Sequence, residues 1–186
     1  MVRASTGELV QNRLHMAAPA LQPIPTSRLR LVPATEAQLR ASLVSRAALS
    51  TATGCAVPDS WPPEHFDAAA VQFTLDWMKR DPRDGKWGFY YIELPGADGA
   101  AGTLIGAGGF KGAPDTDGIV EIGYSLLPEF QRKGYALEAV KGWIDFAFSQ
   151  SKVRMICAHT LANGTASINV LQKAGFKLTG RGYDPG

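Results

Sequence analysis

A short basic turn at residues 131–136 carries the residue types that bind a phosphate group through the main chain. Its sequence is Gln-Arg-Lys-Gly-Tyr-Ala, and it lies between an apolar strand pattern over 119–127 and a helical pattern of apolar residues. The start of a helix presents backbone N–H groups without partners, and the helix dipole favours an anion there. We therefore predict an anion-binding turn in which Gly134 removes a side chain that would block the phosphate, while Arg132 and Lys133 add positive charge.

The turn differs from two common nucleotide-binding motifs. It lacks the Lys-Ser/Thr pair of a nucleotide-hydrolysing P-loop, and it has one glycine where the dinucleotide fingerprint has three. An ordinary strand-to-helix loop that contains a glycine is the alternative. The pattern favours a phosphate-bearing cofactor other than ATP or NAD.

A single carboxylate, Glu121, lies inside the apolar strand pattern that precedes the turn. Because side chains alternate along a strand, Glu121 shares a face with Gly123 and Ser125. Val120, Ile122 and Tyr124 lie on the opposite face. A carboxylate in an apolar strand is costly unless it faces a wet cleft, and burial would raise its pKa. An exposed strand glutamate without a chemical role is the alternative.

Three blocks of sequence, in order along the chain, resemble the GCN5-related N-acetyltransferases (GNAT). The turn is similar to the acetyl-CoA-binding pattern of that family, Arg/Gln-x-x-Gly-x-Gly/Ala. Residues 163–176 resemble the family's Asn-x-x-x-Ser…Leu-x-Lys-x-Gly-Phe ending, and residues 26–35 resemble the opening strand of the ribosomal-protein N-terminal (RimJ/RimL-like) branch. The resemblance covers about residues 26–180. It implies acetyl-CoA as the cofactor and acetyl transfer to a primary amine of a protein N-terminus or a small molecule.

The resemblance also implies which residues bind the cofactor. Backbone N–H groups of the turn would hold the pyrophosphate, and a strand end freed where two strands splay apart would pair with the pantetheine arm. Asn163 would hydrogen-bond the pantetheine amide region, although Asn-Gly is also a common turn and cap pair. The expected cofactor-binding residues are Tyr124, Ser125, Leu126, Gln131, Arg132, Lys133, Gly134, Tyr135, Ala136, Asn163 and Ser167.

The reaction that the resemblance implies is direct attack of a neutral amine on the thioester. Glu121 would be the general base, improved for that role by a raised pKa, and Ser167 would donate to the departing thiolate. Relatives that use a tyrosine as general acid carry it where this chain has Leu171, so the acid is either Ser167 or solvent. The backbone N–H near Leu126 would polarise the thioester oxygen. A non-catalytic acyl-CoA-binding or sensing module is the alternative function.

Composition is that of an ordinary globular domain. The chain has 186 residues, 45% hydrophobic and 19% charged, and its net charge of +2 is too mild to indicate nucleic acid. Neither an apolar run long enough to span a bilayer nor a secretion signal is present, and two distant cysteines, Cys55 and Cys157, predict a reducing cytoplasm.

His15, His65 and His159 show no metal spacing, so no metal is expected, and His159 is expected to be structural. The expected partner is an amine acceptor rather than nucleic acid or membrane, and a homodimer is a possible assembly.

Apolar periodicity predicts a single α/β (α+β) domain of the GNAT fold. An antiparallel meander followed by strand–helix–strand–helix implies a mixed, mostly antiparallel twisted sheet with helices on both faces. Residues 1–25 are expected to be a flexible extension and residues 26–186 the acetyl-CoA-binding domain. Only ten residues follow Phe176, so the closing hairpin of the family is expected to be incomplete. Strands are predicted over 28–32, 87–94, 103–111, 119–127, 153–160 and from 176, and helices over 36–49, 66–79, 137–148 and 165–174.

Overall fold

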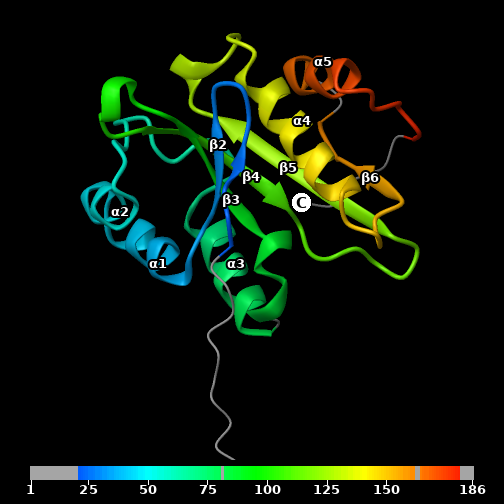
Figure 1. Cartoon of the computed structure of the whole chain (residues 1–186), viewed down its shortest axis with the longest axis horizontal. Helices are drawn as coiled ribbons and strands as arrows, with labels where there is room; N and C mark the ends of the chain where they lie inside the picture. Colours follow the sequence, from blue (N-terminus) through cyan, green and yellow to red (C-terminus); the bar gives the residue numbers. More distant parts are fainter. Residues whose placement is uncertain (1–20, 81, 162–163, 181–186) are drawn as a thin grey trace, which may run out of the picture.

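The computed structural model describes residues 21–80, 82–161 and 164–180, which form a twisted six-stranded sheet with helices around it (Figure 1). The strands lie in the sheet in chain order. Each pair of neighbours is antiparallel except β5 and β6, which are parallel. The predicted mixed, mostly antiparallel sheet is therefore confirmed. The strands are β1 (Ile24–Pro25), β2 (Arg30–Pro33), β3 (Phe89–Leu94), β4 (Thr103–Phe110), β5 (Ile119–Leu126) and β6 (Met155–Cys157).

Helices cover both faces of the sheet, as predicted. No helix in the described part of the chain is long and apolar enough to cross a membrane. The helices are α1 (Glu36–Val44), α2 (Arg46–Thr53), α3 (Ala68–Arg80), α4 (Tyr135–Phe148) and α5 (Thr165–Lys173), with short 3-10 turns η1 (Pro82–Trp87), η2 (Ala97–Gly99) and η3 (Pro128–Phe130).

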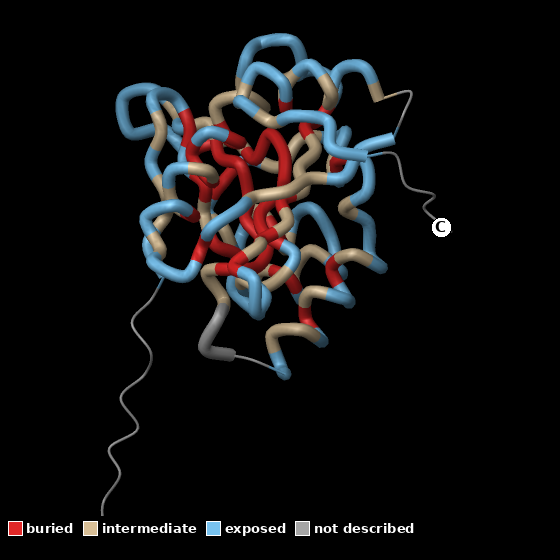
Figure 2. The backbone as a smooth tube through the Cα atoms, turned by 90° about the vertical axis from the view of Figure 1, so that its right-hand side faces the viewer, coloured by how far each residue is buried: buried red, intermediate tan, exposed pale blue. Residues whose placement is uncertain are grey.

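Two apolar cores hold these layers together. Because side chains alternate along β3, Tyr90 enters the core that contains Trp143 of α4, and Tyr91 enters the core that contains Leu75 of α3. All four of these side chains are almost fully buried. The buried segments gather in the middle of the molecule, between the helices (Figure 2). The sheet is thus a rigid support for the loops at its edges.

The first predicted helix, over 36–49, is wrong as a single element. Ser45 adopts an extended conformation (φ −171°, ψ 164°), and its hydroxyl accepts a hydrogen bond from the N–H of Ala48 at 3.0 Å, which caps α2. A serine that binds its own backbone in this way ends one helix and starts another. Thr35 caps α1, in a capping box with Gln38.

The two ends of the domain also differ from expectation. The strand predicted from Phe176 is not formed, because residues 176–180 have no strand partner among the described residues. At the other end, Ile24 and Pro25 belong to the predicted extension yet pair with β2. Residues 1–20 of that predicted extension lie outside the described residues. The domain boundary at residue 26 stays a prediction.

Candidate functional site

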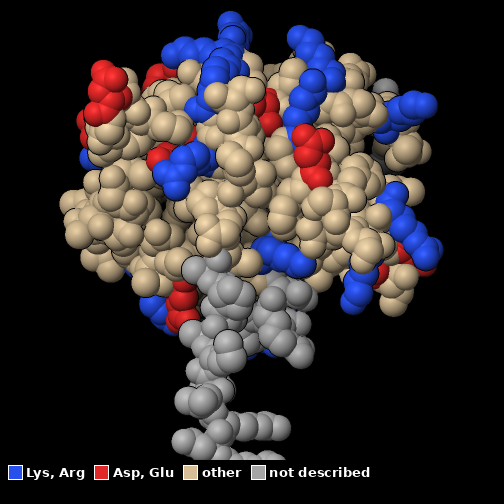
Figure 3. Space-filling model, in the orientation of Figure 1, with Lys and Arg blue, Asp and Glu red and all other residues tan. Residues whose placement is uncertain are grey.

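A long cleft lies between β5 and β6, bounded by the turn before α4 and by α3 and α5. Several Lys and Arg side chains gather at the upper edge of the molecule in Figure 3, where Figure 1 places that turn and α5. The predicted residues that line the cleft are Glu121, Tyr124, Ser125, Leu126, Gln131, Arg132, Gly134, Ala136 and Ser167. Of the remaining predicted residues, Lys133 and Tyr135 belong to the turn but not to the cleft wall, and Asn163 lies outside the described residues.

The turn at residues 131–136 presents several main-chain donors that no described residue accepts from. Gly134 is the N-cap of α4, with φ +82° and no side-chain cap, and Arg132 is also left-handed with φ +59°. Among the described residues, none accepts a hydrogen bond from the N–H groups of residues 132–136. These donors surround the positive end of the α4 dipole, which is the arrangement that binds an anion.

Gln131 behaves differently from the rest of the turn. Its N–H donates to the carbonyl of Pro128 at 3.2 Å, and its side-chain amide donates to the carbonyl of Leu126 at 3.0 Å. The prediction that Gln131 offers a free main-chain donor is therefore wrong, because η3 already occupies that N–H. Gln131 instead ties the turn to the end of β5.

The glycine of the turn is required by its backbone conformation more than by the space in front of it. A side chain at Gly134 would be strained at φ +82°, and its Cβ would lie 3.3 Å from Nη2 of Arg28. The added atom would thus press on Arg28. That it would also block a phosphate stays a prediction.

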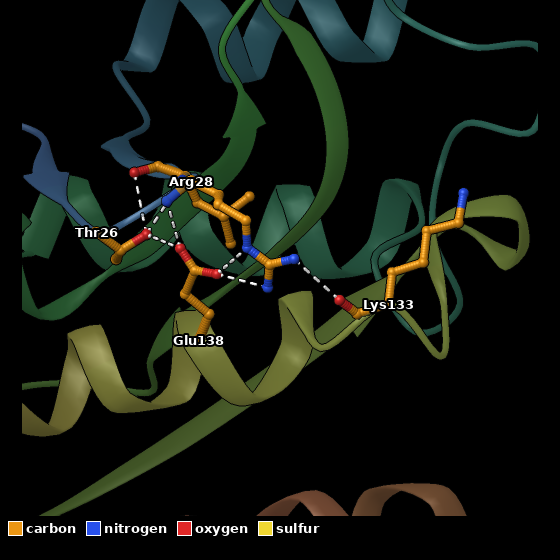
Figure 4. Close-up of polar contacts among 5 residues, drawn as sticks. Thr26, Arg28, Lys133 and Glu138 are labelled. Atoms are coloured by element: carbon orange, nitrogen blue, oxygen red, sulfur yellow. Dashed lines mark hydrogen bonds and ion pairs between the residues drawn. The ribbon is translucent and has the colours of Figure 1, made fainter.

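Arg28, in the loop between β1 and β2, holds the turn in place (Figure 4). Its Nη1 donates to the carbonyl oxygen of Lys133 at 3.1 Å, and its Nε and Nη2 each lie 2.7 Å from Oε2 of Glu138. Its guanidinium also lies over the ring of Tyr135, at 4.6 Å from the centroid. Arg28 therefore joins a carbonyl of the turn to the first turn of α4.

Glu138 completes this network from α4. Its Oε1 accepts hydrogen bonds from the hydroxyl of Thr26 and from the backbone N–H of Arg28, both at 2.6 Å. Burial raises the pKa of Glu138, but the hydrogen bonds from Thr26 and Arg28 outweigh it and hold that pKa below its usual range. Sequence reasoning missed both residues as parts of the site. The block at residues 26–35 was a signal for Arg28, although it was assigned only to a strand.

β5 and β6 separate beyond Glu121. They pair only where residues 119–121 face residues 155–157, so residues 122–126 of β5 have no partner in β6. This is the predicted splay between two strands. It leaves one edge of β5 open toward the cleft.

The hydrogen bonds on the other edge of β5 show which main-chain groups face the cleft. Leu127 donates to the carbonyl of Ile105, and Lys111 donates to the carbonyl of Glu121, both at 2.9 Å. Hydrogen-bonded pairs alternate in an antiparallel ladder. Between these points, the main-chain N–H and C=O groups of odd-numbered residues therefore point toward β4, and those of even-numbered residues point away from it. The N–H groups at positions 124 and 126 therefore point to the open edge, where an extended ligand can add as a strand.

Glu121 lies in a small cluster of charged groups on the cleft wall. Its Oε1 is 3.0 Å from Nδ1 of His159 and also in close contact with Nζ of Lys111. Burial raises the pKa of Glu121, but the contacts with Lys111 and His159 outweigh it, so the net effect is a lowered pKa. The prediction of a raised pKa is wrong for this reason. His159 follows β6 and is 78% exposed, and its contact with Glu121 was not anticipated.

Ser167, near the start of α5, forms a hydrogen bond with the phenol of Tyr124 on β5. The hydroxyl of Tyr124 lies 3.1 Å from Oγ of Ser167. Burial raises the pKa of Tyr124, so the phenol keeps its proton at neutral pH. Leu171, where relatives carry a tyrosine, is buried. A phenol therefore lies beside Ser167 in this protein, but it belongs to Tyr124 of β5 and not to position 171 of α5.

The chain matches the family model described as Acetyltransferase (GNAT) domain over residues 28–177. The uncharacterized N-acetyltransferase YjdG of Bacillus subtilis (strain 168) is 30% identical over 118 residues, which cover 63% of this chain and 67% of YjdG. The uncharacterized N-acetyltransferase YoaA of the same organism is 34% identical over 77 residues, covering 41% of this chain and 44% of YoaA. The alignment thus spans less than half of YoaA.

Solved structures agree in fold. An acetyltransferase from Agrobacterium tumefaciens str. C58 has a TM-score of 0.57 at 21% identity, covering 91% of this chain and 92% of its own. RimL, a ribosomal L7/L12 alpha-N-protein acetyltransferase in complex with coenzyme A, has a TM-score of 0.58 at 20% identity, covering 86% of both chains. From the matched domain and the shared fold, the chain belongs to the GNAT family of acetyl-CoA-dependent acetyltransferases.

Proposed function

We propose that this protein transfers the acetyl group of acetyl-CoA to the primary amine of a peptide N-terminus or a small molecule, by direct attack of the amine on the thioester. One observation carries the proposal. The turn with free main-chain donors and the open edge of β5 line the same cleft. The two halves of the site therefore match the two ends of one long ligand, an anionic diphosphate and an amide-bearing arm.

Different residues bind different parts of the cofactor. The N–H groups of the turn, mainly those of Arg132, Lys133, Gly134 and Ala136, bind the pyrophosphate, with the charge of Arg132 nearby. The open edge at Tyr124 pairs with the pantetheine arm, together with Asn163. The N–H of Leu126 donates to the thioester oxygen, where negative charge develops during attack.

The remaining groups move protons. The ammonium of the acceptor loses a proton at the end of the cleft that holds Glu121, and the neutral amine then attacks the carbonyl carbon. Holding the two reactants together supplies much of the rate. As the carbon–sulfur bond breaks, the thiolate takes a proton from Ser167, which Tyr124 supports, or from solvent. Coenzyme A thiolate is a tolerable leaving group, so a weak acid is sufficient.

Both a peptide N-terminus and a small-molecule amine are compatible with the acceptor end of the cleft. Aromatic side chains of α3 and the segment before it line the cleft there, including Phe66, Phe73 and Trp77. We place the protein in the cytoplasm, since Cys55 and Cys157 are both free thiols. A homodimer stays a prediction, which sedimentation of the purified protein would test.

Calorimetric titration with acetyl-CoA, followed by thiol-release assays against a panel of amines, tests the proposed activity. We expect saturable binding, and release of coenzyme A in the presence of a peptide α-amine or a small primary amine. Saturable binding without release from any amine would favour the acyl-CoA-sensing alternative. Absence of binding would refute both functions.

A further inference from the structure

We propose that His159 is the catalytic base that takes the proton from the acceptor ammonium, and that Glu121 is a positioning residue that orients it. This inference rests on the proposed acetyl transfer in the same cleft. It changes the role expected for Glu121 and gives a role to a histidine that the sequence left as structural.

The first argument is geometric. Nδ1 of His159 lies 3.0 Å from Oε1 of Glu121, an ion-pair contact without hydrogen-bond geometry, and the negative charge of the carboxylate favours the tautomer with its proton on Nδ1. In that tautomer, Nε2 carries the lone pair and is free to accept a proton. The side chain of His159 is 78% exposed and lines the cleft, so this nitrogen is open to an incoming amine.

The second argument concerns accessibility of the carboxylate. Oε1 of Glu121 is buried and makes no hydrogen bond with a described residue, although Lys111 and His159 both lie within ion-pair distance, and only 26% of the side chain is exposed. Lys111 and His159 both stabilise the carboxylate anion, which makes it a weaker base. An imidazole is intrinsically a stronger base than a carboxylate. A histidine oriented by a buried carboxylate is the arrangement that activates nucleophiles in many hydrolases.

The titratable groups that act on Glu121, and on Cys157 two residues before His159, are compatible with this role. Lys111 directly follows β4 and is already paired with Glu121. Cys157 comes from β6, and burial, reinforced by the charge of Glu121, raises the pKa of its thiol. Cys157 therefore stays neutral and does not compete for the proton. Asp115, in the connection between β4 and β5, also acts electrostatically on Cys157.

The proton balance closes without another reactant. One N–H bond of the ammonium breaks, its proton moves to Nε2 of His159, and Glu121 stabilises the resulting imidazolium until solvent removes the proton. The amine nitrogen bonds to the thioester carbon, and the carbon–sulfur bond breaks. The second N–H proton is lost from the tetrahedral adduct as the departing thiolate gains one.

Two substitutions separate a base from a structural contact. His159→Asn keeps a side-chain N–H that can donate to Glu121 but cannot accept a proton in the same way. His159→Ala opens space at an exposed position, into which free imidazole can diffuse. We expect each variant to lose at least about 10²-fold in kcat, while the Kd for acetyl-CoA stays that of the wild type. Added imidazole restores activity to His159→Ala and does not restore it to His159→Asn.

Glu121→Gln provides the opposing measurement. We expect a smaller loss of kcat than in His159→Ala, and no rescue by imidazole, because the base is still present but poorly oriented. A fully active His159→Asn beside an inactive Glu121→Gln would overturn the proposal and leave Glu121 as the base. Loss of activity in His159→Ala that imidazole cannot restore would also overturn it. A wild-type protein that binds acetyl-CoA but acetylates no amine would instead count against the proposed function.

Discussion

Nη1 of Arg28 donates a hydrogen bond to the carbonyl oxygen of Lys133 at 3.1 Å, across 105 positions of sequence. The Lys133 carbonyl and the Gly134 N–H belong to one peptide plane and point in opposite directions, so holding the carbonyl also fixes the direction of that N–H. The donor is thereby oriented before any ligand arrives, which lowers the entropic cost of binding.

Replacement of Arg28 by alanine is expected to weaken acetyl-CoA binding. Removal of the hydrogen bond to Lys133 loosens the turn, and we expect Kd to rise about tenfold, equivalent to about 1.4 kcal/mol. Isothermal titration calorimetry measures this directly. Arg40→Ala is the matched control, since Arg40 forms an exposed ion pair with Glu36 on α1. Equal affinities in both variants would show that Arg28 does not organise the turn.

The Arg28–Glu138 pair predicts a pH-dependent stability. The folded-state pKa of Glu138 is lowered, so the pair stabilises the protein above the unfolded pKa of about 4.3. The stabilisation is lost as the pH falls through the folded-state pKa. Thermal melts of the wild type and Glu138→Gln between pH 7 and pH 3 measure it. We expect the wild type to melt higher at pH 7 and the gap to close in acid. A gap that is independent of pH would contradict this reasoning.

The Tyr124–Ser167 pair predicts non-additive effects on turnover. Tyr124→Phe removes the phenol hydroxyl, and Ser167→Ala removes its partner, so each breaks the same donor pair. We expect each single variant to lose about tenfold in kcat, and the double variant to lose little more. Steady-state kinetics on all four proteins completes the cycle. Additive losses would indicate that the two hydroxyls act separately, and unchanged turnover would make solvent the acid.

Features that depend on adjacent residues could be predicted from the sequence. The strand, glycine turn and helix from Ile119 to Phe148 follow from apolar periodicity and one left-handed glycine. The face of Glu121 follows from strand alternation. The break at Ser45 was not predicted, because no glycine or proline marks it and a single hydroxyl cap decides it.

Contacts between distant segments could not be predicted in the same way. The lowered pKa of Glu121 depends on Lys111 at the end of β4 and on His159 after β6, and the sheet alone brings these residues together. The hydrogen bond between Arg28 and Lys133 likewise requires the loop after β1 to lie against the start of α4. Periodicity describes one element at a time, so it contains no information on such pairings.

The affinity of Gly134→Ala for acetyl-CoA, measured by calorimetry, tests most directly whether the main chain of the turn binds the diphosphate. Gly54→Ala is the matched control, because Gly54 has a similar φ of +70° at the end of α2, where an added Cβ meets nothing within 4 Å. Both variants place an alanine in a similar left-handed conformation, but only Gly134→Ala does so in the turn. We expect Kd to rise at least about tenfold in Gly134→Ala, from strain and displacement of Arg28, and to stay unchanged in Gly54→Ala. A folded Gly134→Ala protein with the affinity of the wild type would contradict the account.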